Sequence, residues 1–290
     1  MKILVTGSSG LVGSALCPLL IEAGHDVIRL KRPAQWDPER SILDSSAISG
    51  ADAIVHLAGE NIASRRWTEA QKRRIRDSRV KGTTLIAETI ARMEQRPQIL
   101  VSASAIGYYG DRGAEVLTED SGPGSGFLAD VCREWEAATE PAARKAVRVV
   151  RLRTGLVLSS KGGAMAKMLP PFKLGLGGPI GSGHQYWSWI SLADVCGAII
   201  HCIRTPDLRG PVNLVSPAPV TNREFTKTLG RVLGRPTIFP LPAIAARLIL
   251  GEMADALLLA SARVEPTRLL ATQFTFKHRE LESTLRELLR

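Results

Sequence analysis

The stretch Met1-Lys-Ile-Leu-Val-Thr-Gly-Ser-Ser-Gly-Leu-Val-Gly13 decides the expected fold. Its apolar run predicts a short buried strand over Lys2–Thr6, and the apolar spacing of Leu11–Ala23 predicts a helix. The glycines between them suit a turn whose backbone conformations a side chain would forbid. They also let backbone N–H groups approach a pyrophosphate, toward which the helix start directs its positive dipole end. The stretch therefore predicts a dinucleotide-binding turn; the alternative is a tight turn that binds nothing.

A second predicted strand, His25–Arg32, ends in two cations, Lys31 and Arg32. A protein that prefers NAD places Asp or Glu at this point to accept hydrogen bonds from the ribose hydroxyls. Two cations would instead attract the 2′-phosphate of NADP. The sequence therefore favours NADP, and the alternative is that both side chains are solvated surface charges.

Strands and helices alternate through the first half of the chain. Further strands are predicted at 51–59, 98–105 and 147–155, and helices at 68–93 and 127–143. This alternation is typical of an α/β fold with a Rossmann-type, doubly wound parallel sheet. We predict an NADP-binding domain over residues 1–158 and a smaller α+β lobe over residues 159–290, with the helix at 191–204 and some strands returning to the first domain.

The second half of the chain contains a glycine-rich stretch and a helix-start motif. Five glycines in residues 173–183 suggest a mobile loop over a cleft. Thr221-Asn-Arg-Glu224 has the pattern of a capping box at a helix start.

Composition narrows the classes of partner. The 290 residues are 44% hydrophobic and 23% charged, as in an ordinary globular protein. The net charge of +10 comes from basic residues spread along the chain, and a basic surface suits an anionic small molecule as well as it suits nucleic acid. Because the sequence carries no nucleic-acid-binding signature, we expect a small-molecule substrate and no nucleic-acid partner. We expect no metal site and no membrane span. The sequence leaves open whether the chain forms a homodimer.

The cysteines and the chain start indicate the compartment. The four cysteines form no CxxC pair and three lie in predicted helices, so we expect free thiols in a reducing environment. Strand residues begin at Lys2, which leaves no room for a signal peptide. We therefore expect a cytoplasmic protein.

With these motifs assembled, the chain resembles the extended short-chain dehydrogenase/reductase superfamily. The resemblance rests on the glycine turn and on His56-Leu-Ala-Gly59, Ser102-Ala-Ser-Ala-Ile-Gly-Tyr-Tyr-Gly110 and Trp189-Ile-Ser-Leu-Ala-Asp-Val195. More narrowly, it is similar to the atypical epimerase family proteins of the SDR39U type. That similarity lies in Gly59-Glu-Asn-Ile62, Arg66-Trp67 and Gly175-Leu-Gly-Gly-Pro-Ile-Gly-Ser-Gly-His-Gln-Tyr-Trp-Ser-Trp-Ile190, and it covers essentially the whole chain.

The resemblance implies a set of cofactor contacts. NADP(H) would meet the pyrophosphate-binding turn at Gly7, Gly10, Leu11 and Val12, and the 2′-phosphate would meet Lys31 and Arg32. Leu57, Ala58 and Gly59 would line the ribose side, Arg79 would reach the cofactor, and the backbone at Leu156 would meet the nicotinamide amide.

The catalytic set departs from the family pattern. Active members carry Ser, Tyr and Lys, with the tyrosine four residues before the lysine; the tyrosine transfers a proton while the lysine lowers its pKa. Here Phe127 or Leu128 stands at the tyrosine position, and Val131 or Cys132 at the lysine position. The remaining candidates for catalysis are Ser104, Tyr108 and Tyr186, with His184 beside the last; His56, inside a buried strand, is predicted to be a core residue.

Two functions therefore stay open. One is an NADP-dependent oxidoreductase or nucleoside-diphosphate-sugar epimerase-like enzyme with an atypical active site. The other is a non-catalytic NADP(H)-binding sensor or scaffold.

Overall fold

The computed structural model describes residues 1–289, which divide into two compact units. Unit 1 comprises Met1–Ala105, Asp130–Arg153 and Cys196–Val212. Unit 2 comprises Ile106–Ala129, Thr154–Val195 and the chain from Asn213 onward. Both units are therefore assembled from separate stretches of sequence.

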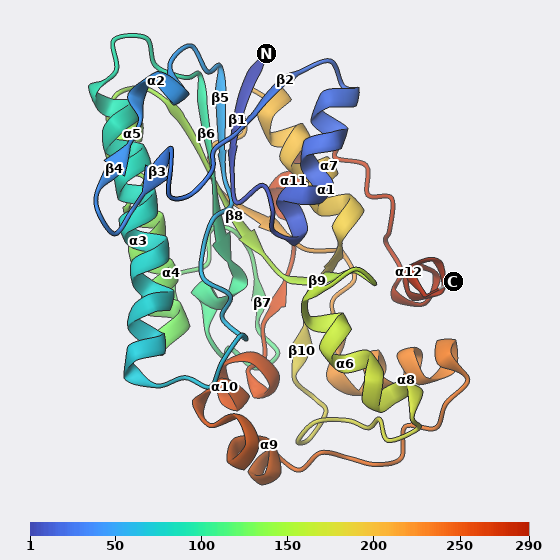
Figure 1. Cartoon of the computed structure of the whole chain (residues 1–290). Helices are drawn as coiled ribbons and strands as arrows, with labels where there is room; N and C mark the ends of the chain where they lie inside the picture. Colours follow the sequence, from blue (N-terminus) through green and yellow to red (C-terminus); the bar gives the residue numbers. More distant parts are fainter. Residues whose placement is uncertain (290) are drawn as a thin grey trace. The chain divides into compact units, whose positions relative to one another are not determined.

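A six-stranded sheet forms the centre of unit 1 (Figure 1). Its order is β12-β8-β6-β5-β1-β2, and the pairs β1–β2, β1–β5 and β5–β6 are parallel. The order reverses between β1 and β5, which is the point where doubly wound sheets bind their ligands. This confirms the predicted Rossmann-type fold. The strands are β1 (Lys2–Thr6), β2 (Asp26–Arg29), β5 (Ala53–His56), β6 (Ile99–Ala105), β8 (Arg148–Thr154) and β12 (Gly210–Leu214).

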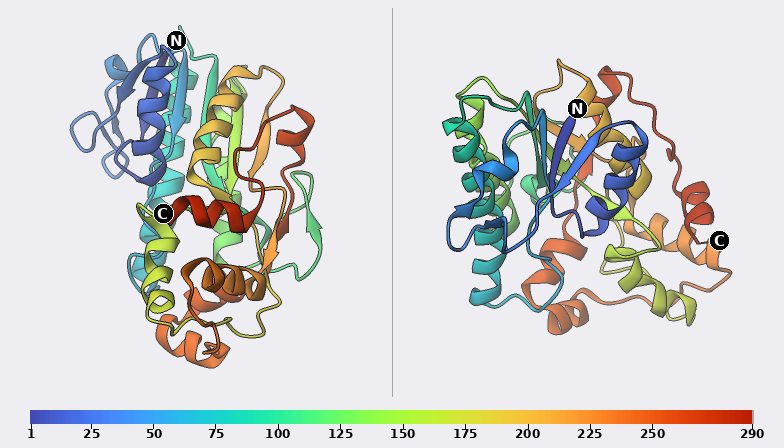
Figure 2. Two further views of the ribbon diagram at one scale, coloured as in Figure 1. Left: turned by 90° about the vertical axis from the view of Figure 1, so that its right-hand side faces the viewer. Right: turned by 45° about the horizontal axis from the view of Figure 1, so that its top comes forward.

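Helices cover both faces of this sheet. Figures 1 and 2 show α3 (Glu69–Arg92) and α5 (Glu140–Ala143) on one face, and α1 (Leu11–Glu22) and most of α7 (Leu192–Arg204) on the other. Strand residues such as Leu4, Ile54 and Leu100 pack with Ile86 and Ile90 of α3 in one buried cluster. Because both faces are buried, the central strands read as continuous apolar runs in the sequence.

Two stretches differ in detail from the prediction, and residues 36–48 form elements of their own. The helix predicted at 127–143 is interrupted: α4 (Phe127–Ala137) ends before α5, where proline occupies the first turn. Proline has no N–H to continue the ladder of the preceding helix. The second strand ends at Arg29, before the two cations. Residues 36–48 form a hairpin of β3 (Trp36–Asp37) and β4 (Ile42–Leu43), followed by the short helix α2 (Ser45–Ile48).

Unit 2 contains short strand pairs and small helices. The pairs are β10 (Tyr186–Trp187) with β13 (Val220–Thr221), β11 (Trp189–Ser191) with β9 (Leu156–Leu158), and β14 (Arg263–Val264) with β7 (Val116–Leu117). The helices are α6 (Gly163–Lys173), α8 (Asn222–Leu233), α9 (Ala243–Leu250), α10 (Glu252–Ala254), α11 (Thr267–Ala271) and α12 (Leu281–Leu288). The capping box predicted at the start of α8 is confirmed, because Thr221 and Glu224 exchange both side-chain hydrogen bonds with the backbone.

The glycine-rich stretch at 173–183 is hydrogen-bonded to a second segment of unit 2. The N–H of Gly181 donates to the Leu241 carbonyl at 2.9 Å, and the N–H of Leu241 donates to the Pro179 carbonyl at 2.9 Å. A Cβ on Gly178 would lie 1.9 Å from the Phe239 carbonyl oxygen. Glycine is therefore required here because the two backbones approach so closely.

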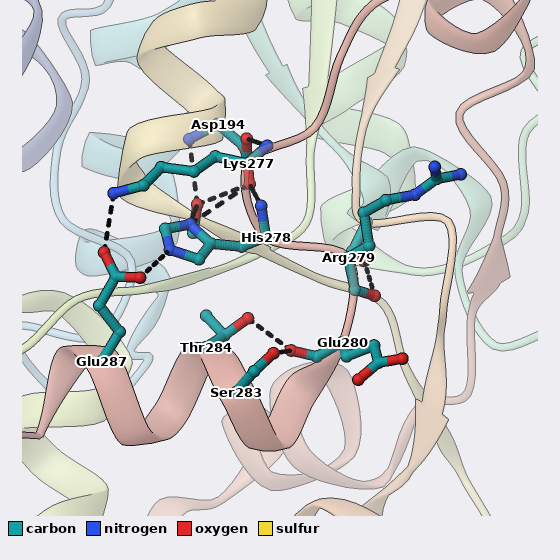
Figure 3. A network of polar contacts seen from close by, with 10 residues as sticks. Asp194, Lys277, His278, Arg279, Glu280, Ser283, Thr284 and Glu287 are labelled. Carbon is teal, nitrogen blue, oxygen red and sulfur yellow. Dashed lines mark hydrogen bonds and ion pairs between the residues drawn. The ribbon is translucent and has the colours of Figure 1, made fainter.

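A polar network joins the start of α7 to the C-terminal segment within unit 2 (Figure 3). The Asp194 carboxylate accepts the backbone N–H groups of Lys277 at 2.7 Å and His278 at 3.0 Å. The His278 ring lies 2.8 Å from the Ser191 hydroxyl on one side and 3.1 Å from the Glu287 carboxylate on the other. These contacts anchor α12, which carries Glu287.

Three further properties of residues 1–289 concern the cysteines, metal-binding groups and membrane spans. All four cysteines are free and buried. No group of three or more His, Cys, Asp or Glu side chains in this range could hold a metal ion. In the same range, the helices are all too short or too polar to cross a membrane.

Candidate functional site

The glycine turn packs directly against the end of β5. Gly7 has φ +66°, and a Cβ there would lie 2.8 Å from the Ala58 nitrogen and from the Leu57 carbonyl carbon. Both the backbone conformation and the lack of space exclude a side chain at this position. The structure therefore brings three of the predicted cofactor contacts, Gly7, Leu57 and Ala58, together at the carboxyl edge of the sheet.

The first turn of α1 begins at this turn without a side-chain cap. Gly10 is the N-cap residue, and its N–H donates to the Gly7 carbonyl at 3.0 Å. A Cβ on Gly13 would lie 2.3 Å from the same carbonyl oxygen, so α1 sits against the turn. The N–H groups of Leu11 and Val12 belong to the first helical turn, which has no intrahelical acceptors for them. These donors fit the pyrophosphate of a dinucleotide.

The two predicted 2′-phosphate ligands follow β2. The backbone of exposed Lys31 is tied to the Gln35 side chain, whose oxygen accepts its N–H at 3.0 Å. Arg32 lies over the buried Trp36 ring, with its guanidinium carbon 5.6 Å from the ring centroid. Its Nη2 is 3.8 Å from carboxylate oxygens of Asp37 and Glu39, and its side chain is 46% exposed. Pairs this long and exposed are weak, so the guanidinium is available to a stronger anion.

Arg79 of α3 lies against the loop that follows β5. A Cβ on Gly59 would be 3.4 Å from the Arg79 guanidinium carbon, which also sits 5.0 Å from the Trp135 ring centroid. Its Nη1 donates to the Ile75 carbonyl at 3.0 Å, and within residues 1–289 no carboxylate oxygen lies within 4.0 Å of it. Burial lowers the pKa of Arg79, although Cys132 and Glu60 oppose the shift. A half-buried cation with no carboxylate within ion-pair distance is suited to an anionic or hydroxyl-rich ligand.

His56 is a core residue, as predicted. Its ring is fully buried at the end of β5, with Nδ1 2.7 Å from the Thr6 hydroxyl and the ring edge-on to Trp36. Burial lowers its pKa to about 4. The imidazole is therefore neutral at physiological pH.

Ser104 belongs to a buried ionic network in unit 1. Its hydroxyl donates to Glu136 Oε1 at 2.8 Å. Glu136, on α4, accepts two hydrogen bonds from Arg153 of β8, at 2.8 and 2.9 Å. The side chains of Glu136 and Arg153 are 5% and 4% exposed. The hydroxyl proton of Ser104 is thus directed toward a buried carboxylate.

Four residues of α4 were expected to stand at or beside the positions of a catalytic tyrosine and lysine: Phe127, Leu128, Val131 and Cys132. Val131 and Cys132 are buried in α4. Burial raises the pKa of the Cys132 thiol to about 12, with Glu136 adding to the shift. Cys132 is therefore a neutral thiol, and neither Phe127 nor Leu128 can donate a proton.

The other predicted site residues lie in unit 2. The ring of Tyr108 packs edge-on against Tyr109, whose hydroxyl lies within hydrogen-bond distance of two acceptors, the Thr118 carbonyl at 2.9 Å and Asn213 Oδ1 at 2.7 Å. Tyr186 lies beneath the guanidinium of Arg263 at 5.1 Å. The Leu156 N–H donates to the Ser188 carbonyl at 2.9 Å.

Sequence reasoning missed Glu136, Arg153 and Arg263. Alternating charge in the strand at 147–155 was a signal for Arg153, because a charged residue inside a buried strand needs a partner. Glu136 and Arg263 had no comparable signal.

Comparison with known proteins gives a consistent result. Residues 3–214 match the family described as "NAD dependent epimerase/dehydratase family", and residues 241–288 match a "Domain of unknown function (DUF1731)". An epimerase family protein of Mycobacterium bovis is 45% identical over 288 residues, covering 97% of this chain and 95% of the relative. Human epimerase family protein SDR39U1 is 39% identical over 294 residues, covering 99% of each. A crystal structure of human SDR39U1 (isoform 2) with NADPH superposes with a TM-score of 0.92 at 37% identity, covering 99% of each chain.

Proposed function

Because the chain belongs to the NAD-dependent epimerase/dehydratase family, we propose that it binds NADP(H) and is an oxidoreductase or epimerase-like enzyme acting on a small polar substrate. The observation that carries the cofactor proposal is the turn at Gly7, which packs on Leu57 and Ala58 and leaves the uncapped start of α1 open to a pyrophosphate. The human relative was crystallised with NADPH, which supports the same assignment.

The proposed roles of the cofactor-binding residues follow from their positions. Leu11 and Val12 hold the pyrophosphate through backbone N–H groups, while Gly7 and Gly10, whose own N–H donates to the Gly7 carbonyl, form the turn that lets the phosphates approach. Lys31 and Arg32 hold the 2′-phosphate, because both follow β2 and neither is engaged in a short ion pair. Leu57, Ala58 and Gly59 line the ribose side with Arg79 against them, and Leu156 meets the nicotinamide amide.

The bound cofactor supplies hydride chemistry, and the chain must supply or take up the proton. Tyr108 and Tyr186 are the proposed proton donors, since a phenol can take the part of the missing family tyrosine. Ser104 is the weaker candidate because its proton is directed to Glu136.

The alternative is a non-catalytic NADP(H)-binding sensor or scaffold. One specific observation favours it. By the resemblance, Phe127 or Leu128 stands at the position of the family's tyrosine and Val131 or Cys132 at that of its lysine, and the Cys132 thiol is buried and neutral.

Cofactor selectivity is tested by fluorescence titration with NADPH and NADH. Removing a charge-assisted contact to the 2′-phosphate, about 1.5–3 kcal/mol, should raise the Kd for NADPH roughly ten- to hundredfold in Arg32→Ala, with NADH binding unchanged. Lys81→Ala is the matched control, because it removes an exposed cation paired with Asp77 on α3. Equal affinity of the wild-type protein for the two cofactors would remove the selectivity argument, and no binding of either would refute the proposal.

Catalysis is tested by NADPH oxidation against a panel of carbonyl compounds and by chromatographic analysis of nucleotide sugars, because epimerisation returns the hydride and leaves the cofactor's redox state unchanged. Tyr108→Phe and Tyr186→Phe keep the aromatic ring but remove the phenol. Loss of turnover in one of these variants, with NADPH affinity retained, identifies the proton donor. Tight NADPH binding with no turnover on any compound favours the sensor or scaffold.

A further inference from the structure

Strand β14 of unit 2 carries an arginine whose backbone is fixed on both sides. The buried Ser188 hydroxyl donates to the Ala262 carbonyl at 2.7 Å and accepts the Val264 N–H at 2.9 Å. Arg263 lies between these two residues. Hydrogen bonds on either side hold its Cα in one position, so its side chain starts from a rigid base.

The Arg263 side chain has a ring beneath it and no acceptor. Its guanidinium carbon lies 5.1 Å from the Tyr186 ring centroid. Among residues 1–289, no carboxylate oxygen comes within 4.0 Å of its nitrogens. Its Nε is buried and has no hydrogen-bond partner in the protein, a state that it shares with Arg151 Nε, Asn222 Nδ2 and His56 Nε2. Native structures rarely leave a buried donor of this kind unpaired, and for Arg263 an acceptor from outside the chain would satisfy it.

Two other arginines of the chain show the usual arrangement. Arg153 is paired with the Glu136 carboxylate, and Arg148 donates to four backbone carbonyls, among them Cys202 at 2.7 Å and Ile203 at 2.8 Å. Both have their donors satisfied within the fold. Arg263 differs from both because its buried Nε has no partner; Arg151 of β8 shares that property, but Arg263 also lies over an aromatic ring.

Both candidate tyrosines are associated with β14, but through different residues of the strand. Tyr186 stacks on Arg263, and the Tyr186 carbonyl accepts the Ala262 N–H at 3.3 Å. Tyr108 packs against the buried cluster that contains Ala262 and Val264, the neighbours of Arg263. Successive side chains of a strand point to opposite faces, so a ligand held by Arg263 would lie beside Tyr186, one of the two groups proposed to move a proton.

We infer that Arg263, supported by the Tyr186 ring, binds an oxyanion group of the substrate, either a carboxylate or a phosphate. A guanidinium presents a planar fork of N–H donors that matches two oxygens of such a group, and stacking on a ring limits its rotation. This assigns an anionic substrate class, in agreement with the net charge of +10. The inference rests on the proposed function only for what happens to the ligand after it binds.

The test follows the Arg263 Nε–H signal by NMR in the ¹⁵N-labelled full-length protein. The signal is assigned by its loss in Arg263→Lys. Sodium malonate and sodium phosphate are titrated separately, with sodium chloride at matched ionic strength as the reference. The inference predicts a saturable shift with at least one probe. Malonate alone identifies a carboxylate site, and phosphate alone a phosphate site.

Variants make the assignment specific. Anion affinity, followed by the thermal stabilisation that each probe gives, should fall about tenfold in Arg263→Lys, because the ammonium loses the bidentate geometry. Tyr186→Phe keeps the supporting ring and should bind within about twofold of wild type, whereas Tyr186→Ala should bind more weakly. Arg231→Lys is the control, since Arg231 is an exposed arginine of unit 2 paired with Glu282.

NADPH titration of the same samples separates the two proposals. A signal that moves with malonate and phosphate only as it does with chloride, in protein that binds NADPH, overturns the anion site and leaves the cofactor proposal intact. That outcome would mean that water satisfies the Arg263 donor. Saturable anion binding in protein that binds neither NADPH nor NADH would instead refute the proposed function and keep the anion site.

Discussion

Replacing Arg153 with methionine should destabilise unit 1 by about 3–5 kcal/mol, because it leaves the Glu136 carboxylate buried without its partner. The two side chains are 4% and 5% exposed and share hydrogen bonds of 2.8 and 2.9 Å. Their charge centres are then about 4 Å apart, which corresponds to an attraction of about 4 kcal/mol at an effective dielectric constant of about 20. The usual cost of breaking a buried ion pair and the Coulomb attraction calculated for this pair are therefore of similar size.

The helix that carries Glu136 provides its own control. Arg133 and Asp130, also on α4, form an ion pair of the same length, 2.8 Å, but their side chains are 59% and 52% exposed. Exposed pairs contribute about 0–1 kcal/mol, so Arg133→Met should have little effect. Glu136→Gln combined with Arg153→Met removes both charges and keeps an oxygen for the Ser104 hydroxyl. This double variant should recover most of the lost stability.

Guanidinium unfolding followed by tryptophan fluorescence measures these differences. Trp135 is a suitable reporter because it neighbours Glu136 on α4 and donates to the Thr83 hydroxyl at 2.9 Å. If Arg153→Met costs no more than Arg133→Met, the reasoning from burial is wrong. If the double variant is as unstable as Arg153→Met alone, the loss comes from packing rather than from the uncompensated charge.

Three further predictions concern the candidate site. Burial lowers the pKa of His56 from 6.5 to about 4, so the free energy of unfolding should fall by about 3 kcal/mol in total as the pH falls from 6.5 toward 4. In His56→Asn, urea unfolding should show a flatter pH dependence over this range. Gly13→Ala places a Cβ 2.3 Å from the Gly7 carbonyl oxygen, and the resulting strain of about 1–3 kcal/mol should weaken NADPH binding about tenfold or more. Gly24→Ala is the control: its Cβ would meet open space, so NADPH affinity should stay unchanged although the positive φ lowers stability. Burial raises the pKa of Cys132 to about 12, so iodoacetamide at neutral pH should leave this thiol unlabelled in the native protein and label it in denaturant, as measured by mass spectrometry. Rapid labelling of Cys132 in the native protein would contradict its burial.

The sheet of unit 1 could be predicted because its signals are local. Ile3, Leu4 and Val5 are fully buried between two helical layers, and a strand buried on both faces must be apolar at every position. The turn at Gly7 could be predicted for the same reason, because the backbone conformation and the close approach of the segment that follows β5 both require glycine. The capping box at Thr221 depends on residues only three positions apart.

The polar chemistry could not be predicted in the same way. Glu136 and Arg153 lie 17 positions apart on a helix and a strand, and only the folded sheet brings them together. Their pairing also explains why Ser104, selected as a hydroxyl near a strand end, directs its proton into the protein. For Arg263 the deciding facts are a ring beneath it and missing acceptors, which are properties of tertiary structure and have no sequence pattern.

The way unit 2 is assembled has a consequence for synthesis on the ribosome. Val116 and Leu117 pair with Arg263 and Val264, and the Asp194 carboxylate is satisfied by N–H groups of residues 277 and 278 (Figure 3). The nascent chain must therefore hold an unpaired strand and an Asp194 carboxylate without these two donors until residues 263–278 have been translated. Pairings this distant in sequence fold slowly, so early fragments of unit 2 should depend on chaperones more than those of unit 1, whose final segment ends at Val212.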